Sequence, residues 1–108
     1  MSKCSVELLN AAWQDIDKIA DFHLEKVGVE SAQRITDKIL DGIERLTEFP
    51  LMGPLHPDPE LSILGYRKLV LTKTYVAVYR VIEDEIYLPH CQWRYRLPKI
   101  ITITGKKL

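Results

Sequence analysis

The chain has 108 residues, of which 46% are hydrophobic and 28% are charged, and its formal net charge is zero. This length suits one domain with its own core, and the composition excludes a disordered or fibrous chain. We therefore expect residues 1–108 to form a single domain. The sequence contains no apolar stretch long enough for a signal peptide or a membrane span. We expect a cytoplasmic protein with no membrane partner.

The charges are unevenly distributed along the chain. Residues 1–50 carry six basic and ten acidic side chains, a balance of −4, whereas residues 61–108 carry nine basic and three acidic side chains, a balance of +6. The C-terminal half is therefore the candidate anion-binding side. Solvated strand faces and an irregular tail would show the same pattern, so charge alone does not decide between the two interpretations.

In the first third of the chain, residues 4–8 predict a short strand, and Asn10 is suited to cap a helix that begins at Ala11. Gly28 ends this helix. Its apolar side chains recur at three- and four-residue steps and share one face, where His23 is expected to pack in the core. The stripe consists of Ala12, Ile16, Ile19, His23 and Val27.

A second helix is predicted from Ser31 to Phe49, because Pro50 forbids simple continuation and the apolar residues repeat the helical spacing. Two antiparallel helices joined by a short link are implied. Each has an apolar stripe that must be buried, so together they would cover one face of a sheet. The second stripe consists of Ala32, Ile35, Ile39, Ile43 and Leu46.

Residues 50–59 contain four of the six prolines together with Gly53, which predicts a loop. Three segments rich in Val, Ile, Leu and Tyr follow and predict an antiparallel meander, with strands at 65–72, 75–82 and 86–92. The expected fold class is α+β: an N-terminal strand and an antiparallel helix hairpin packed on a mainly antiparallel sheet of about four strands.

The chain has no glycine-rich phosphate loop, nucleophile elbow or metal-ligand motif, and we expect neither a cofactor nor a metal. His90 and Cys91 are consecutive on a predicted strand, so their side chains point to opposite faces and are poorly placed to hold one ion. Cys4 and Cys91 are far apart in the sequence, and we interpret them as thiols that fill small core positions.

Short motifs spread over residues 4 to about 91 resemble the RelE/ParE toxin superfamily of type II toxin–antitoxin systems. The opening from Val6 to Asp17, with Ala12 and Asp15, also fits this family. The motifs are Phe49-Pro50-Leu51-Met52-Gly53, Leu64-Gly65-Tyr66-Arg67, Tyr75-Val76-Ala77-Val78-Tyr79-Arg80-Val81, and Ile86-Tyr87 followed by His90.

The resemblance implies a toxin that a cognate antitoxin neutralises by wrapping around it. It also implies one of two targets, because interferase members cut ribosome-bound mRNA whereas the ParE branch poisons DNA gyrase. We expect an mRNA endoribonuclease; the alternatives are a gyrase inhibitor and an inactive toxin that retains only antitoxin binding. Both targets need a positive, partly aromatic surface.

RNA cleavage of the family type has the 2′-hydroxyl attack the neighbouring phosphate, so the site must take up one proton, deliver another and neutralise charge. By motif position, Arg67 and Arg80 are the candidate phosphate clamps, and His90 is the candidate general acid or base. Replacing either arginine should then abolish toxicity without unfolding the domain. The open alternatives are a surface ion pair of Arg80 with residues 83–85 and a solvent-edge His90 without a role.

Further candidates for RNA binding are Lys68 and Lys73, which would add positive charge, and Tyr75. Tyr75 and Tyr79 face the same way on their strand, which fits core packing better than base stacking. One departure counts against catalysis: many interferases place an arginine immediately after this tyrosine, and here the residue is Val76.

The family pattern is lost after His90. Codons for residues 92–101 can be chosen so that the next reading frame spells Asn-Gly-Asp-Thr-Asp-Tyr-Pro-Lys-Leu-Leu, which resembles the usual family ending. We therefore predict a frameshift that makes residues 92–108 atypical and weakens the toxin. The alternative is a natural variant in which Arg94 and Arg96 extend the RNA-binding surface.

Overall fold

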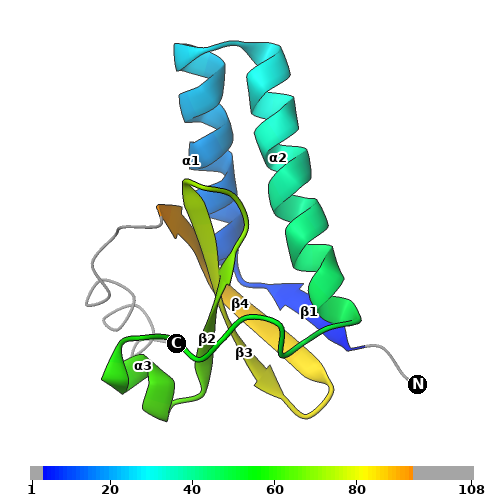
Figure 1. Ribbon diagram of the computed structural model, residues 1–108. Coiled ribbons are helices and arrows are strands. Elements are labelled where there is room, and N and C mark those ends of the chain that lie inside the picture. The colour runs from blue at the N-terminus through cyan, green and yellow to red at the C-terminus, as the bar shows by residue number, and fades with distance from the viewer. Residues whose placement is uncertain (1–3, 94–108) are drawn as a thin grey trace.

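The computed structural model describes residues 4–93, and these form an α+β fold, as the sequence predicts (Figure 1). No helix in this range is long and apolar enough to cross a membrane. Arg45–Thr47 forms a short 3₁₀ turn after the second helix. In chain order the elements are β1 (Ser5–Leu8), α1 (Asn10–Lys26), α2 (Val29–Glu44), α3 (Pro59–Ile63), β2 (Tyr66–Val70), β3 (Tyr75–Ile82) and β4 (Glu85–Trp93).

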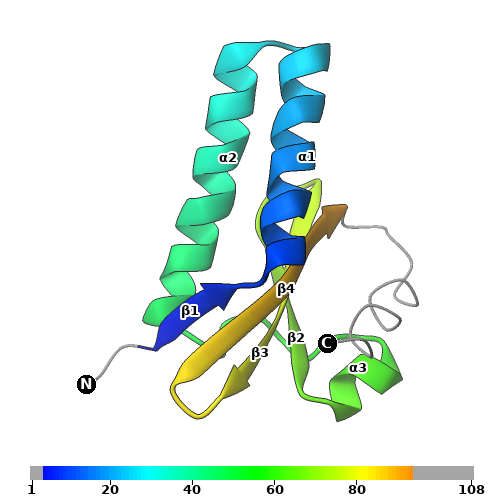
Figure 2. The same ribbon diagram turned by 180° about the vertical axis from the view of Figure 1, so that it is seen from behind.

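The four strands form one sheet in the order β1-β4-β3-β2. β1 runs parallel to β4, whereas β2, β3 and β4 form an antiparallel meander, which confirms the predicted mainly antiparallel sheet. α1 and α2 form an antiparallel hairpin that projects beyond the strands (Figures 1 and 2). On the opposite side of the sheet, Leu61 of α3 packs with Tyr66 and Val78 in a smaller cluster.

The main core lies between the hairpin and the sheet, and most of the predicted apolar stripes line it. Val27 is an exception, because it is 71% exposed. α1 ends one residue before it, at the tip of the hairpin, where no strand lies underneath (Figure 1). The buried core side chains are Ala12, Ile16, Ile19, Ile39, Ile43, Leu46, Leu69, Tyr75, Ala77, Tyr79, Ile86, Leu88 and Cys91.

Several predicted helix ends were wrong. Asn10 is the first residue of α1 rather than its cap, and Leu9 in the cap position offers no side-chain hydrogen bond. α2 begins two residues before Ser31, directly after Gly28, whose φ of 142° turns the chain between the helices. The predicted proline loop also runs into α3, because the Asp58 side chain accepts a hydrogen bond from the Glu60 amide and caps the helix.

A β-bulge in β4 changes which side chains face the core. Val78 pairs with His90 while Arg80 pairs with Tyr87, so Leu88 and Pro89 together lie opposite one residue of β3. Proline suits a bulge because it has no N–H to contribute to the ladder. Leu88 and Cys91, three residues apart, therefore both reach the main core. His90, between Pro89 and Cys91, faces the other side of the sheet.

The loop after α2 is tied to the sheet by the hydroxyl of Tyr79, a residue with no exposed surface. This hydroxyl donates to the Pro50 carbonyl at 2.8 Å and accepts from the Gly53 amide at 3.0 Å. A side chain at Gly53 would come within 2.8 Å of the Lys68 carbonyl oxygen, so the close approach of loop and sheet requires glycine there. The loop is therefore held against β2 and β3.

Replacing Tyr79 with Phe should destabilise the fold by about 1–2 kcal/mol, because it leaves the buried Gly53 amide without its acceptor. Urea denaturation followed by circular dichroism measures this loss. The matched control is Tyr87→Phe, which removes an exposed hydroxyl that donates to Glu85 and should leave the midpoint almost unchanged. Equal midpoints for both variants would contradict the assigned role of Tyr79.

Candidate functional site

Three of the predicted site residues lie on the face of the sheet opposite the hairpin, which we call the distal face. The register places Lys68, Val78 and His90 in one row across β2, β3 and β4. Arg80 lies in the neighbouring row beside Tyr66, with its guanidinium carbon 5.5 Å from the centre of that ring. This distance allows a cation–π contact. The distal face therefore combines two cations, an imidazole and an aromatic ring.

Arg67 lies on the other face, the one covered by the hairpin. It pairs with Tyr79, a residue of the main core, and its guanidinium donates to the Gly53 carbonyl at 2.8 Å. The structure therefore does not bring Arg67 together with Arg80 and His90. Strand alternation is the physical reason, since Tyr66 and Arg67 are consecutive and Tyr66 packs on the distal side.

Tyr75 and Tyr79 are both buried in the main core, which confirms the packing interpretation of this pair. Burial raises the pKa of each hydroxyl. The Tyr75 hydroxyl lies 3.1 Å from Nε2 of His23, and Nδ1 of the same ring lies 3.1 Å from the Ser31 hydroxyl. His23 is half-buried and links α1, α2 and β3 rather than being fully packed in the core.

Of the two lysines predicted to contact RNA, Lys68 lies on the distal face and Lys73 lies away from it, beside α2. Lys73 is exposed in the turn between β2 and β3, and Lys68 is half-buried. Arg80 makes no ion pair with residues 83–85 within the described part of the chain, so that alternative is wrong there. Arg94, Arg96 and most of the atypical segment 92–108 lie outside residues 4–93.

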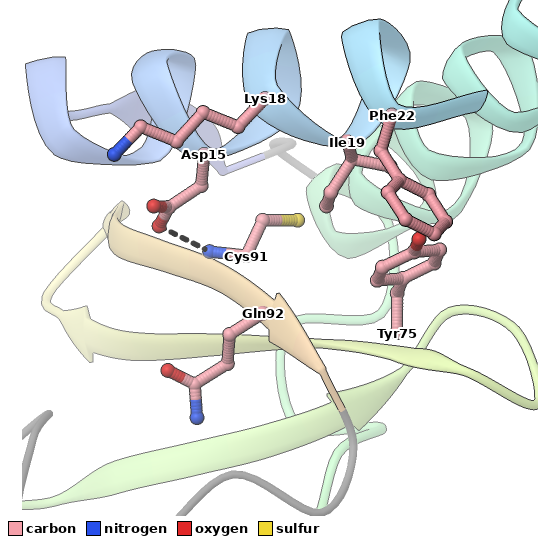
Figure 3. Close-up of a pocket in the computed structure, with 7 residues that line it drawn as sticks. All are labelled: Asp15, Lys18, Ile19, Phe22, Tyr75, Cys91 and Gln92. Atoms are coloured by element: carbon pink, nitrogen blue, oxygen red, sulfur yellow. Dashed lines mark hydrogen bonds between the residues drawn. The ribbon is translucent and has the colours of Figure 1, made fainter. Parts of the chain in front are cut away.

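His90 is paired with Asp15 of α1. The pairing of β1 with β4 ends at Leu88, so the outer edge of β4 is open to Asp15 beyond that point. One oxygen, Oδ2, lies 2.9 Å from Nδ1 of His90. The same oxygen accepts a hydrogen bond from the Cys91 amide at 3.2 Å (Figure 3). Nε2 of His90 is buried and has no hydrogen-bond partner among residues 4–93. Asp15 thus fixes both the strand edge and the ring.

Asp15 and Cys91 also line a hollow of about 230 Å³ between α1 and β4 (Figure 3). This volume is below the roughly 300–1,000 Å³ that small-molecule sites usually enclose. Burial, together with the Asp15 carboxylate, raises the pKa of Cys91 to about 12, so the thiol is not a nucleophile at neutral pH. Figure 3 also labels Lys18, Ile19, Phe22, Tyr75 and Gln92 around this hollow.

The structural roles of two side chains, Asp15 and His56, were not predicted from the sequence. Asp15 was assigned only to a family motif, and no local pattern places it 75 residues away beside His90. His56 is 6% exposed, and its Nδ1 accepts a hydrogen bond from the Asp58 amide. Burial, assisted by nearby Lys68, lowers the pKa of His56. Within residues 4–93 there is no cluster of three or more His, Cys, Asp or Glu side chains able to hold a metal ion.

Solved toxin structures share this fold. The chromosomal ParDE system from P. aeruginosa has a TM-score of 0.72 at 24% identity, over 84% of this chain and 96% of that chain. The RelBE2 toxin–antitoxin complex from Mycobacterium tuberculosis has a TM-score of 0.63 at 17% identity, over 85% of this chain and 99% of that chain. The YoeB/ParE toxin from Agrobacterium tumefaciens has a TM-score of 0.55 at 21% identity, over 84% of this chain and 99% of that chain.

A family model provides the stronger comparison. A search of curated proteins finds no match. However, the model of the ParE toxin of type II toxin–antitoxin systems, parDE, matches residues 6–88. This range contains both helices of the hairpin, the tethered loop, β2, β3 and the start of β4. Since the match spans most of the sequence, the chain belongs to the ParE toxin family of type II toxin–antitoxin systems.

Proposed function

We propose that this toxin acts by binding, as an inhibitor of DNA gyrase, and that a cognate antitoxin neutralises it. The observation that carries the proposal is the separation of the three candidate catalytic residues. Arg67 lies on the hairpin side of the sheet, hydrogen-bonded to the Gly53 carbonyl of the loop, whereas Arg80 and His90 lie in rows of the distal face. RNA cleavage requires proton donor, proton acceptor and phosphate clamp to converge on one reacting group.

Two further features support a binding role. Tyr75 is 1% exposed and Tyr79 has no exposed surface, so neither ring offers a face for stacking on RNA bases. Val76 stands where many interferases have an arginine. The resemblance assigns gyrase to the ParE branch, and both the family match and the ParDE neighbour fall in that branch. Arg80 with Tyr66 and Lys68 is then the candidate contact surface for the target.

The mRNA endoribonuclease remains the second candidate, and the Asp15–His90 pair favours it. Asp15 orients the His90 ring through Nδ1, as a carboxylate orients the imidazole of a general base, and Nε2 would have to become exposed to meet a substrate. In this alternative, the second phosphate clamp has to come from Arg94 or Arg96, which lie outside the described residues. An inactivated chain that retains only antitoxin binding is the third candidate.

Induced expression without the antitoxin should separate these three candidates. For a gyrase inhibitor, we expect DNA damage signalling to rise before incorporation of labelled amino acids falls, and purified gyrase to lose supercoiling activity when the toxin is added. Cleavage of ribosome-bound mRNA with unaffected gyrase would overturn the proposal in favour of the endoribonuclease. Normal growth, with both assays unchanged, would identify the chain as inactive.

Arg80 and Arg67 should differ when each is replaced by alanine. Arg80→Ala should weaken gyrase inhibition with little loss of stability, because this half-buried side chain makes one ring contact. Arg67→Ala should cost about 1–3 kcal/mol, since it removes a charged donor from the Gly53 carbonyl. The sequence predicts that neither replacement unfolds the domain, and the hydrogen bond of Arg67 now predicts a larger loss of stability for Arg67→Ala than for Arg80→Ala. Urea denaturation measures the difference, and Arg67→Lys is the control that restores a donor.

The predicted frameshift is tested by a version of the chain restored to the shifted frame from Gln92 onward. Both versions are expressed from the same inducible promoter without antitoxin. If the frameshift weakened the toxin, the restored chain should arrest growth and the present chain should not. Equal toxicity would contradict the frameshift and would favour a natural variant that uses Arg94 and Arg96.

A further inference from the structure

α3 is a short helix with one buried side chain. It lies beside β2, at the end of the molecule away from the hairpin tip (Figure 1). Among its five residues Leu61 alone is buried, and it packs against Tyr66 and Val78 on the distal face. A helix this short is not stable by itself, because ordering the first turn costs more entropy than its hydrogen bonds return. α3 therefore depends on contacts that hold its first turn in place.

Hydrogen bonds of His56 and Asp58 hold this first turn. The Asp58 carboxylate accepts from the Glu60 amide at 2.8 Å, and the Asp58 carbonyl accepts from the Ser62 amide at 2.8 Å. The Asp58 amide donates to Nδ1 of His56 at 3.1 Å. The His56 amide in turn donates to the Tyr66 carbonyl at 2.9 Å. His56 thus connects the start of α3 to β2.

The hydrogen bond from Asp58 fixes the protonation state of His56. A ring nitrogen that accepts from a backbone N–H carries no proton, so the neutral ring has its proton on Nε2. The ring is buried, and the charged groups that act on it are Lys68 of β2 and Asp58 at the start of α3. Burial and the Lys68 charge lower the pKa of His56, and the Asp58 carboxylate opposes them in part. The folded arrangement therefore favours the neutral imidazole.

Protonation of His56 is incompatible with this arrangement. Nδ1–H would face the Asp58 N–H, so two donors would meet where one hydrogen bond had formed, in a buried place near the Lys68 ammonium. The Asp58 carboxylate is the anion that could turn to the new cation, but it would then stop capping α3. Pro57 and Pro59 fix φ on either side of Asp58, so the segment has little freedom to avoid the conflict. Either response removes a hydrogen bond from the start of α3.

We propose that His56 is an acid-sensitive switch that releases α3 from β2 and exposes the distal face around Tyr66. Release separates Leu61 from Tyr66 and Val78. It leaves the main core in place, because the residues of that core come from the hairpin, the 3₁₀ turn and the strands. Arg80 lies over the Tyr66 ring, so release also changes the surroundings of this arginine. The switch does not depend on whether the target is gyrase or mRNA.

The direction of the pH effect follows from the neutral state of His56 in the folded chain. With α3 in place, the pKa of His56 lies below its ordinary value of 6.5, and after release the pKa of the ring returns toward that value. The released form therefore binds more protons, and it is favoured as the pH falls below about 6.5. Well above this pH, His56 is neutral in both forms and has no pH-dependent effect on α3.

Hydrogen exchange of the full chain, followed by nuclear magnetic resonance, measures the release. We compare protection factors, which are corrected for the intrinsic pH dependence of exchange, at about pH 7.5 and about pH 5.5. Between these values the protection of the Ser62 and Gly65 amides, which donate to the Asp58 and Ser62 carbonyls, should fall by about five- to tenfold. The amides of β3 should change by less than about twofold. An equal fall in α3 and β3 would mean that acid unfolds the whole domain, and it would show the proposal to be wrong.

His56→Asn is the matched variant. An asparagine side chain accepts from the amide two residues further along the chain, as His56 does, but its oxygen does not titrate. The protection of the Ser62 and Gly65 amides should then change by less than about twofold over the same range. His23 and His90 are unchanged in this variant, so they contribute equally to both measurements. The same pH dependence with and without His56 would contradict the switch.

The unmodified chain decides the question if His56→Asn does not fold. Its three histidines are His23, His56 and His90, and the nitrogen chemical shifts of each ring report which nitrogen carries a proton. At about pH 7.5 we expect Nδ1 of His56 without a proton, and the backbone shifts of α3 should change with the same midpoint as the His56 ring. A proton on Nδ1 at this pH, or an α3 midpoint that follows His23 or His90 instead, would overturn the proposed switch.

Discussion

The buried hydroxyl of Tyr79 is the interaction on which the arrangement of the rest depends. It joins the middle of β3 to the Pro50 carbonyl and the Gly53 amide, and Arg67 completes the connection through the Gly53 carbonyl. A buried amide or carbonyl without a partner costs more than a hydrogen bond gains, so loop, sheet and arginine stabilise one another. This network uses Arg67 as a structural donor and thereby removes it from the distal face.

The bulge at Leu88 and Pro89 lies opposite the same tyrosine and determines the chemistry of β4. It lets Leu88 and Cys91 both fill the core, which places His90 on the distal side. Asp15 then occupies the strand edge that β1 is too short to cover, and accepts from both His90 and the Cys91 amide. A histidine held in this way is oriented by the fold, whether its role is chemical or structural.

The sequence by itself determined the element order, the helix hairpin, the meander and the family, because hydrophobic periodicity and short motifs are local properties. It favoured core packing for Tyr75 and Tyr79, but it also proposed Tyr75 as a contact for RNA, and this ring is buried. It did not predict α3, whose start signal at Asp58 and Pro59 lies within a proline-rich segment. Only the tertiary structure decided which candidate residues meet. Strand alternation places Arg67 and Arg80 on opposite faces of the sheet. The bulge in β4 shifts the alternation of inward and outward side chains, so that His90 shares a row with Val78. Asp15 contacts His90 and Cys91, which lie 75 and 76 residues further along the chain. The register, the bulge and these contacts arise from pairing between distant segments, which no local pattern in the sequence records.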